Sequence, residues 1–223
     1  MIYVFLANGF EETEAIAPID MLRRAKLDVK TVGVGTSTPT SSHGIQVKAD
    51  LTEDEVKLND DLQLIVLPGG MPGTLNLEDS ETVQNAIAYC VKNGIPVGAI
   101  CAAPSILGRL GLLSGRNAVC FPGFEQYLEG AHVQNKLCVT DGKFTTACGA
   151  GAAIAFGIEA RRWCGPAPPK CRRKWEWGRS PRRSGRCPPP DRPSSPGTSC
   201  PGYSSETAPP DTPPCRDRQE RTA

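Results

Sequence analysis

Cys101 stands between a short apolar run and a proline, a setting in which a cysteine can become reactive. The run Ile95–Ile100 is too short for a helix and is predicted to form a strand buried on both faces. Pro104 marks the first turn of a helix, where the N–H that proline lacks would have no partner anyway. Unpaired backbone N–H groups and the positive helix end then favour a thiolate at Cys101. The alternative is a buried structural cysteine, because free cysteine packs as a small hydrophobic residue.

Two further groups follow predicted strands. Glutamates at 11, 12 and 14 come after the strand Ile2–Leu6, and Gly69 and Gly70 come after the strand Leu62–Leu67. In a parallel sheet the carboxyl ends of the strands meet at one edge, where ligands bind. We therefore expect these groups to converge on Cys101.

A cysteine nucleophile needs a stabilised thiolate, a group that moves protons, and donors for a developing oxyanion. The N–H groups of Gly70 and Ala102 are predicted to hold the oxyanion, and Gly69 to lie against the substrate. A protonated Glu14 would donate a hydrogen bond to the thiolate, whereas an ionised one would repel it. The alternatives are a tight turn at the glycines and solvated glutamates that favour a helix N-terminus.

The chain has only two histidines. His132 is a candidate catalytic residue near Cys101, and His43 a candidate contact for an anion at the mouth of the site; for both, the alternative is an ordinary surface residue. The first 160 residues show no zinc-binding spacing, P-loop or GxGxxG motif, so we expect neither a metal nor an organic cofactor.

Strands alternating with helices must position these residues, and this order indicates a parallel sheet covered on both faces. Helices are predicted over Glu11–Lys26, Leu75–Asn93, Pro104–Leu112 and Gly149–Ala160. Further strands are expected at Val29–Val34, His43–Val47, Asn117–Cys120, Leu137–Thr140 and Phe144–Ala147, with a single helical turn at Thr52–Val56.

Composition divides the chain near Ala160. Residues 161–223 contain no Ile, Leu, Val, Met or Phe, yet hold 14 of the 21 prolines and five of the ten cysteines. Such a segment cannot bury enough apolar surface to offset its ordering entropy, so a disordered Arg/Pro/Cys-rich tail is predicted. The tail carries 14 basic and 6 acidic residues, and residues 1–160 carry 11 and 18. An acidic domain is thus joined to a basic tail.

The five cysteines of residues 1–160 have no paired spacing, which favours a reducing, cytoplasmic setting over a disulfide framework. Glu11 and Glu12 follow the apolar start at once, without a basic leader, so no secretory signal is expected. No run approaches the roughly 18 apolar residues of a membrane span. A real basic tail would bind acidic partners or nucleic acid, but the prolines and cysteines that interleave its basic residues argue against this alternative.

Three motifs resemble the ThiJ/PfpI superfamily, most closely its branch of DJ-one protein deglycases and their small bacterial relatives. They are Phe-Glu-Glu-Thr-Glu-Ala at 10–15, Val-Leu-Pro-Gly-Gly at 66–70 and Ala-Ile-Cys-Ala-Ala-Pro at 99–104. The resemblance covers residues 1–160. It implies a flavodoxin-like α/β three-layer sandwich, a homodimer, and a cysteine on a strained nucleophile elbow.

Carried over residue by residue, the resemblance matches Cys101 to the reactive, oxidation-sensitive cysteine and Glu14 to the protonated acid beside it. It matches His132 to a histidine near the site, and Gly70 and Ala102 to the backbone donors. The activities it implies are glyoxalase chemistry without glutathione, deglycation of methylglyoxal adducts, chaperone action and peroxide sensing.

Three departures from the family pattern matter. Ala102 stands where the peptidase branch has histidine, which argues against a peptidase. His43 falls where deglycase relatives often have arginine. The last helix, which relatives continue, runs into Arg161 and the tail. We therefore interpret the tail as a frameshift product of a GC-rich reading frame.

The sequence leaves two classes of function. The first is an enzyme in which the Cys101 thiolate attacks methylglyoxal, or its adducts with thiols or amines, and Glu14, with His132, moves protons until lactate is released. The second is a redox sensor or chaperone whose cysteine is oxidised to a sulfinate. The enzyme needs a proton-transfer group within roughly 3 Å of the reacting atoms, whereas the sensor needs only an accessible thiolate of low pKa.

Overall fold

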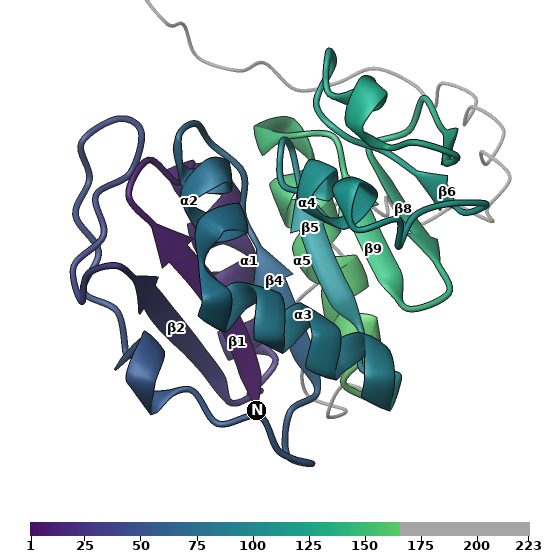
Figure 1. Ribbon diagram of the computed structural model, residues 1–223. Helices are drawn as coiled ribbons and strands as arrows, with labels where there is room; N and C mark the ends of the chain where they lie inside the picture. The colour runs from purple at the N-terminus through teal and green to yellow at the C-terminus, as the bar shows by residue number, and fades with distance from the viewer. Residues whose placement is uncertain (166–223) are drawn as a thin grey trace, which may run out of the picture. The chain divides into compact units, whose positions relative to one another are not determined.

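Seven strands form one sheet in the order β3-β2-β1-β4-β5-β9-β8, and helices cover both of its faces (Figure 1). The structure is a computed structural model, and it describes residues 1–165. The sheet consists of β1 (Ile2–Ala7), β2 (Val29–Val34), β3 (Leu51–Thr52), β4 (Leu64–Leu67), β5 (Val97–Ile100), β8 (Cys138–Asp141) and β9 (Phe144–Ala147). The helices are α1 (Glu12–Arg24), α2 (Gly73–Asp79), α3 (Glu81–Asn93), α4 (Pro104–Arg109) and α5 (Ala153–Arg162).

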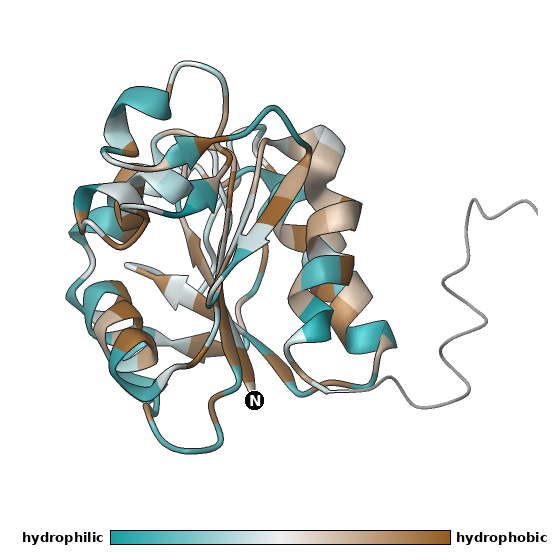
Figure 2. Cartoon of the chain, turned by 90° about the vertical axis from the view of Figure 1, so that its right-hand side faces the viewer, coloured by the Kyte–Doolittle hydropathy of each residue, from teal (hydrophilic) through white to brown (hydrophobic). Residues whose placement is uncertain are grey.

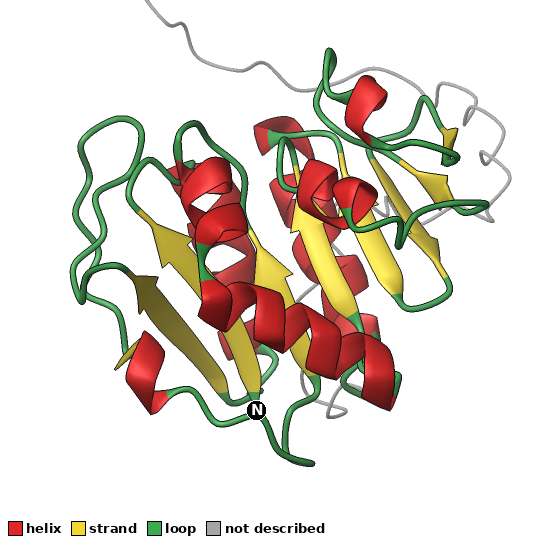
Figure 3. Ribbon diagram, in the orientation of Figure 1, coloured by secondary structure: helices red, strands yellow, loops and turns green. Residues whose placement is uncertain are grey.

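All strand pairs of this sheet are parallel except β8 with β9 (Figure 3). Ile100, the last residue of β5, pairs with Ala147, the last residue of β9. The carboxyl ends of β1, β4, β5 and β9 therefore lie along one edge, as predicted from the alternation of strands and helices. The predicted α/β sandwich with a mostly parallel sheet is confirmed.

The core lies in two layers, one on each side of the sheet (Figure 2). Side chains of α2, α3 and α4, among them Leu77, Ile87 and Ile106, pack on one face. Side chains of α1 and α5, among them Ile19, Leu22 and Phe156, pack on the other. Strands covered on both faces must be apolar throughout, and all six residues of β1 are buried.

The predicted helix Leu75–Asn93 is two helices. Ser80 ends α2 and begins α3, because its side-chain oxygen accepts a hydrogen bond from the N–H of Val83 at 3.2 Å. Serine at a helix start satisfies an N–H that has no partner within the helix. In α1 the apolar Ile16 is exposed, whereas the acidic Glu14 is buried.

The region between α4 and β8 differs most from prediction. The strand predicted at Asn117–Cys120 is reduced to β6 (Asn117–Ala118), which pairs with an unpredicted two-residue strand, β7 (His132–Val133). The predicted strand His43–Val47 is only a bridge between Thr40 and Gln46. Single turns of 3-10 helix occur at Glu53–Glu55, Glu125–Tyr127 and Ala150–Ala152.

The predicted boundary at Ala160 falls inside α5, which continues to Arg162. The indole Nε1 of Trp163 then donates a hydrogen bond to Thr145 Oγ1 on β9 at 3.0 Å, and Lys143 Nζ lies 5.2 Å from its ring centroid. The first residues of the predicted tail are thus packed on the sheet. The rest of that prediction, residues 166–223, lies outside the described residues.

Among the helices described, none has both the length and the apolar character needed to cross a bilayer.

Candidate active site

Cys101 forms a sharp turn between β5 and α4. Its φ of 66° lies in the left-handed region, which a residue with a β-carbon rarely adopts. The turn is held at both ends: the N–H of Cys101 donates to Ala147 O at 2.9 Å, and its C=O accepts from the N–H of Phe121 at 2.7 Å. These bonds fix the direction of the half-buried thiol at the sheet edge.

Glu14 reaches the thiol from the first turn of α1. Glu11 caps that helix, since its Oε2 accepts from the N–H of Glu14 at 2.6 Å. The Glu14 side chain is buried, with 1% of the residue exposed, and its Oε2 accepts from the N–H of Gly69 at 3.1 Å. The carboxyl group is also hydrogen-bonded to the Cys101 thiol and to the backbone N–H of Ala150.

Burial sets the electrostatics of this pair. It raises the pKa of Glu14 from 4.5 to about 7, with the charge of Glu11 adding to the effect and the hydrogen bonds to Cys101, Gly69 and Ala150 opposing it. Burial also raises the pKa of Cys101 to about 12, and the negative charge of Glu14 adds to this. The expectation that this setting favours a thiolate at Cys101 is therefore wrong, because burial outweighs the backbone N–H groups that lower its pKa.

The two groups act as one unit at neutral pH. One proton leaves the pair near pH 7 and the second only near pH 12, so between these values the pair holds one proton and one negative charge. A thiolate beside a neutral carboxyl group and a thiol beside a carboxylate are two forms of the same state. Passing the proton to Glu14 therefore makes the nucleophile without adding charge to the buried site.

Glycines make room for this pair. A β-carbon on Gly69 would lie 2.6 Å from both Cys101 Cβ and Glu14 Oε2. Gly70 has a φ of 94°, and its N–H and that of Ala102 both donate to the Cys101 thiol, which lowers the pKa of that thiol against the larger effect of burial. The structure thus brings five of the predicted site residues together: Cys101, Glu14, Gly69, Gly70 and Ala102.

Three residues of this site had not been predicted. Phe121 bonds the backbone of Cys101, Ala150 donates to Glu14, and a β-carbon on Gly149 would lie 3.7 Å from Glu14 Oε1. Gly149 and Ala150 follow β9 just as Gly69 and Gly70 follow β4. A glycine shortly after a strand could therefore have indicated Gly149 as a site residue, whereas no sequence motif indicated Phe121.

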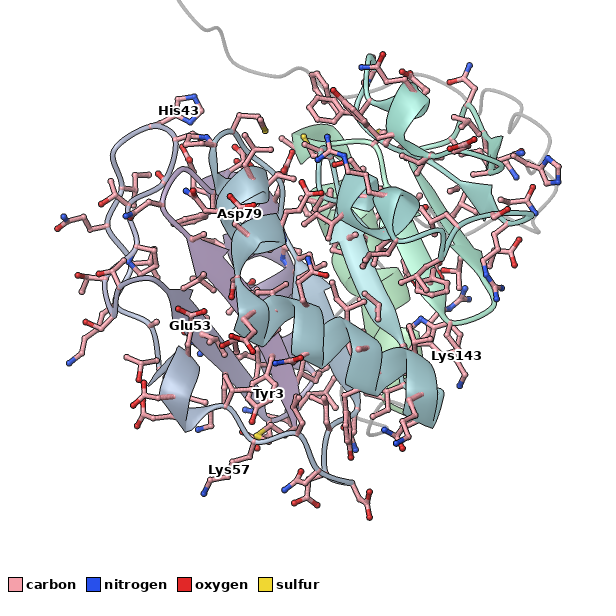
Figure 4. The ribbon with its side chains drawn as sticks, viewed as in Figure 1. Tyr3, His43, Glu53, Lys57, Asp79 and Lys143 are labelled. Atoms are coloured by element: carbon pink, nitrogen blue, oxygen red, sulfur yellow. The ribbon has the colours of Figure 1, made fainter. Side chains whose placement is uncertain are left out.

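The structure does not bring His132 to Cys101. Register places His132 opposite Asn117, and its N–H donates to Arg116 O at 2.8 Å. The N–H of Asn117 donates in turn to Asp141 Oδ2 at 2.8 Å, and Asp141 pairs with Phe144, at the opposite end of β9 from Ala147. Figure 4 shows Lys143 at this far end of the strand. The predicted proximity fails because β7 pairs with β6 instead of folding over the site.

His43 lies at the outer tip of the loop that follows β2 (Figure 4). Its Nδ1 is 2.8 Å from Glu12 Oε1. Burial opposes ionisation of Glu12, but hydrogen bonds from its own N–H, Ser41 and His43 hold its pKa below the usual value. His43 therefore pairs with α1 and does not point to the thiol. Among the described residues, Glu11, Glu12 and His43 form the one group whose ligand atoms are close enough for a metal ion.

Comparisons with known proteins identify the family of this chain. The model of the DJ-1/PfpI family matches residues 1–162. Protein DJ-1 homolog B of Arabidopsis thaliana is 36% identical over 160 residues, which is 70% of this chain and 36% of that protein. Deglycase PH1704 of Pyrococcus horikoshii is 33% identical over 143 residues, 63% of this chain and 84% of that protein. The chain thus spans about a third of the length of the plant relative.

Solved structures of DJ-1 proteins share this fold. A crystal structure of a cysteine-to-alanine mutant of a DJ-1 superfamily protein, STM1931 of Salmonella typhimurium, superposes with a TM-score of 0.71 at 31% identity, covering 77% of this chain and 94% of that one. Drosophila melanogaster DJ-1beta superposes with a TM-score of 0.69 at 31% identity, covering 74% and 90%.

Proposed function

The chain belongs to the DJ-1/PfpI family, and we propose that it is a cysteine-dependent enzyme of the glyoxalase and deglycase type. Its substrates are methylglyoxal or the adducts of methylglyoxal with thiols and amines, and its product is lactate, formed without glutathione. The relative from Pyrococcus horikoshii is named a deglycase, which supports a reactive carbonyl substrate. Family membership likewise supports a cytoplasmic homodimer, which sedimentation and localisation of the tagged chain would test.

One observation carries this proposal: a buried carboxyl group whose pKa is raised to about 7 is hydrogen-bonded to a cysteine thiol. A general acid or base works best when its pKa is close to the working pH. A purely structural cysteine has no need of such a partner, because burying a carboxyl group is costly. Glu14 thus has the protonation behaviour that a proton shuttle requires.

The steps follow from the two side chains. The Cys101 thiolate adds to the aldehyde carbon, and the neutral carboxyl group of Glu14 protonates the new oxyanion to give a hemithioacetal. The Glu14 carboxylate then takes the hydrogen of that carbon, which forms an enediol, and returns a proton to the neighbouring carbon. The result is a lactoyl thioester, which water hydrolyses to lactate and free enzyme. With an amine or thiol adduct as substrate, the amine or thiol leaves from the carbon that Cys101 attacks.

Lactate formation from methylglyoxal in the absence of glutathione tests the proposal. The comparison is between the full chain and Cys101→Ser, after circular dichroism has shown that both are folded. We expect turnover by the full chain and none by the variant. A folded chain that makes no lactate, either from methylglyoxal or from a methylglyoxal-treated peptide, would contradict the proposal.

The second candidate is a peroxide sensor, and a specific observation favours it. Two backbone N–H groups, of Gly70 and Ala102, and the Glu14 carboxyl group surround the Cys101 sulfur. These donors would hold the oxygens of a sulfinate as well as those of a substrate. Mass spectrometry after hydrogen peroxide treatment tests this role. A gain of two oxygens confined to Cys101, in a chain without turnover, is the result that the sensor predicts.

A further inference from the structure

Three exposed apolar side chains line a single cavity of about 840 Å³. Phe121, Val133 and Leu137 are 46%, 43% and 60% exposed. Cys148 and Gly149 line the same cavity. Apolar side chains scattered singly over a surface need no explanation, but several around one hollow mark a binding site.

The cavity shares a wall with the candidate active site. Phe121 lines the cavity, and its N–H donates to Cys101 O at 2.7 Å. Gly149 lines it too, and a β-carbon there would lie 3.4 Å from the Phe121 ring and 3.7 Å from Glu14 Oε1. Ala150, a third lining residue, donates to Glu14. The cavity is thus bounded by residues that hold the Cys101 turn and the Glu14 carboxyl group.

The size and lining of the cavity indicate what it binds. The methyl group of methylglyoxal takes about the volume of one water molecule, roughly 30 Å³, so it would leave the cavity almost empty. Sites for small organic molecules are mostly apolar, with volumes of about 300–1,000 Å³ and a few polar groups. Lys136, Glu125 and Gln134 supply polar groups here.

We propose that this cavity is a subsite for a bulky apolar substituent on the ketone carbon of a 2-oxoaldehyde. Aryl and long-chain 2-oxoaldehydes are then better substrates than methylglyoxal. The inference rests on the proposed function and names its substrate class. The aldehyde carbon is oxidised to a carboxylate, the ketone carbon is reduced to an alcohol, and water is the only co-reactant, so phenylglyoxal gives mandelate and no external oxidant is needed.

Gly151 allows a sharp test. It lines the cavity, and a β-carbon there has no neighbour within 4 Å, so Gly151→Leu adds a bulky apolar side chain at the cavity wall with no clash at its β-carbon. Gln126→Leu places the same side chain in a different surface hollow and is the matched control. We expect the full chain to prefer phenylglyoxal over methylglyoxal in kcat/KM by roughly tenfold or more, the range that hydrophobic pockets reach. Gly151→Leu should lower that ratio about tenfold, and Gln126→Leu should leave it unchanged.

A binding measurement separates this inference from the proposed function. In NMR titrations of the full chain, mandelate should shift the amide signals of Val133 and Leu137, and Gly151→Leu should abolish the shifts. If both occur without turnover of either aldehyde, the enzyme proposal fails and the cavity remains a ligand site. If both aldehydes turn over at equal rates and mandelate shifts nothing, the subsite is overturned and the enzyme stands. A Gly151→Leu variant that changes only the sedimentation coefficient would mean that a second copy covers the cavity, and would also overturn the subsite.

Discussion

The carboxyl group of Glu14 is hydrogen-bonded to the thiol of Cys101, although β1 and β5, the strands that precede them, are not neighbours in the sheet. Strand β4 lies between them and is followed by Gly69, whose missing side chain leaves the space that the two groups share. The consequences of this contact can be measured in several independent ways.

Glu14→Gln should lower kcat/KM about 100-fold or more, because general acid–base catalysis typically contributes 10²–10⁴-fold. Glutamine keeps the shape and the hydrogen bonding of the carboxyl group but cannot carry a proton to and from substrate. Lactate formation from methylglyoxal measures the effect. Asp20→Asn, on the exposed face of the same helix, is the control and should change kcat/KM less than twofold. Full activity of Glu14→Gln would exclude Glu14 as the proton shuttle.

The pH dependence of kcat/KM should follow the titration of Glu14 and Cys101. The reactive state has lost one proton, so kcat/KM should rise as the pH passes about 7, the pKa of Glu14, and should not fall again until the pH nears 12, the pKa of Cys101. A profile of lactate formation between pH 5 and 10 tests this. A rate that is constant from pH 5 to 8 would contradict it.

Glu14→Gln should also stabilise the fold in alkaline solution. The folded chain keeps a proton on Glu14 that the unfolded chain releases between pH 4.5 and about 7, so stability falls as the pH rises through this range. The free energy of unfolding lost in this way reaches about 3 kcal/mol at pH 8. Urea denaturation should show a gain of up to that size for the variant at pH 8 and none at pH 4. Equal effects at the two pH values would mean that burial does not raise this pKa.

Gly69→Ala should damage both the fold and the site. Its methyl group would lie 2.6 Å from Cys101 Cβ and Glu14 Oε2, so the pair must separate. The cost is typically 1–3 kcal/mol of unfolding free energy for an overpacked position. Gly151→Ala is the matched control, since its methyl group meets nothing within 4 Å and should change stability by less than about 0.5 kcal/mol. Urea denaturation of both variants gives the comparison, and equal stabilities would contradict it.

Backbone strain at Cys101 predicts an unusual order of stabilities. Its φ of 66° suits glycine better than any residue with a β-carbon, so Cys101→Gly should be more stable than Cys101→Ala by about 1 kcal/mol. The two variants lack the thiol alike, so the difference isolates the backbone. At most positions inside a strand or helix, by contrast, glycine makes the protein less stable than alanine does. A less stable Cys101→Gly, measured by urea denaturation, would show that the turn holds no strain.

The sequence predicted the position of a site residue correctly where the chemistry of the residue and the local strand pattern indicated the same place. Cys101 lies between an apolar strand and Pro104, and Gly69 follows another such strand, so both could be placed at one sheet edge. His132 could not be placed, because the two-residue pairing of β6 with β7 has no local pattern in the sequence. The pKa of Cys101 was also beyond prediction, since it depends on burial and on a glutamate from another element. Ser80 is a helix-start residue by type, yet the apolar periodicity on both sides concealed the break.

Glu14, Gly69, Cys101 and Gly149 come from segments spread over most of the described chain, so a fragment that ends before β9 lacks part of the site. Of the strands described, β9 is the last to leave the ribosome, and it lies beside β5, where Ala147 O accepts a hydrogen bond from the N–H of Cys101. Contacts between such distant segments form late, after loop closure has been overcome. During synthesis the thiol therefore meets Glu14 and its backbone donors only after almost the entire described domain has emerged, so the raised pKa of Cys101 is a chemical marker of completed folding.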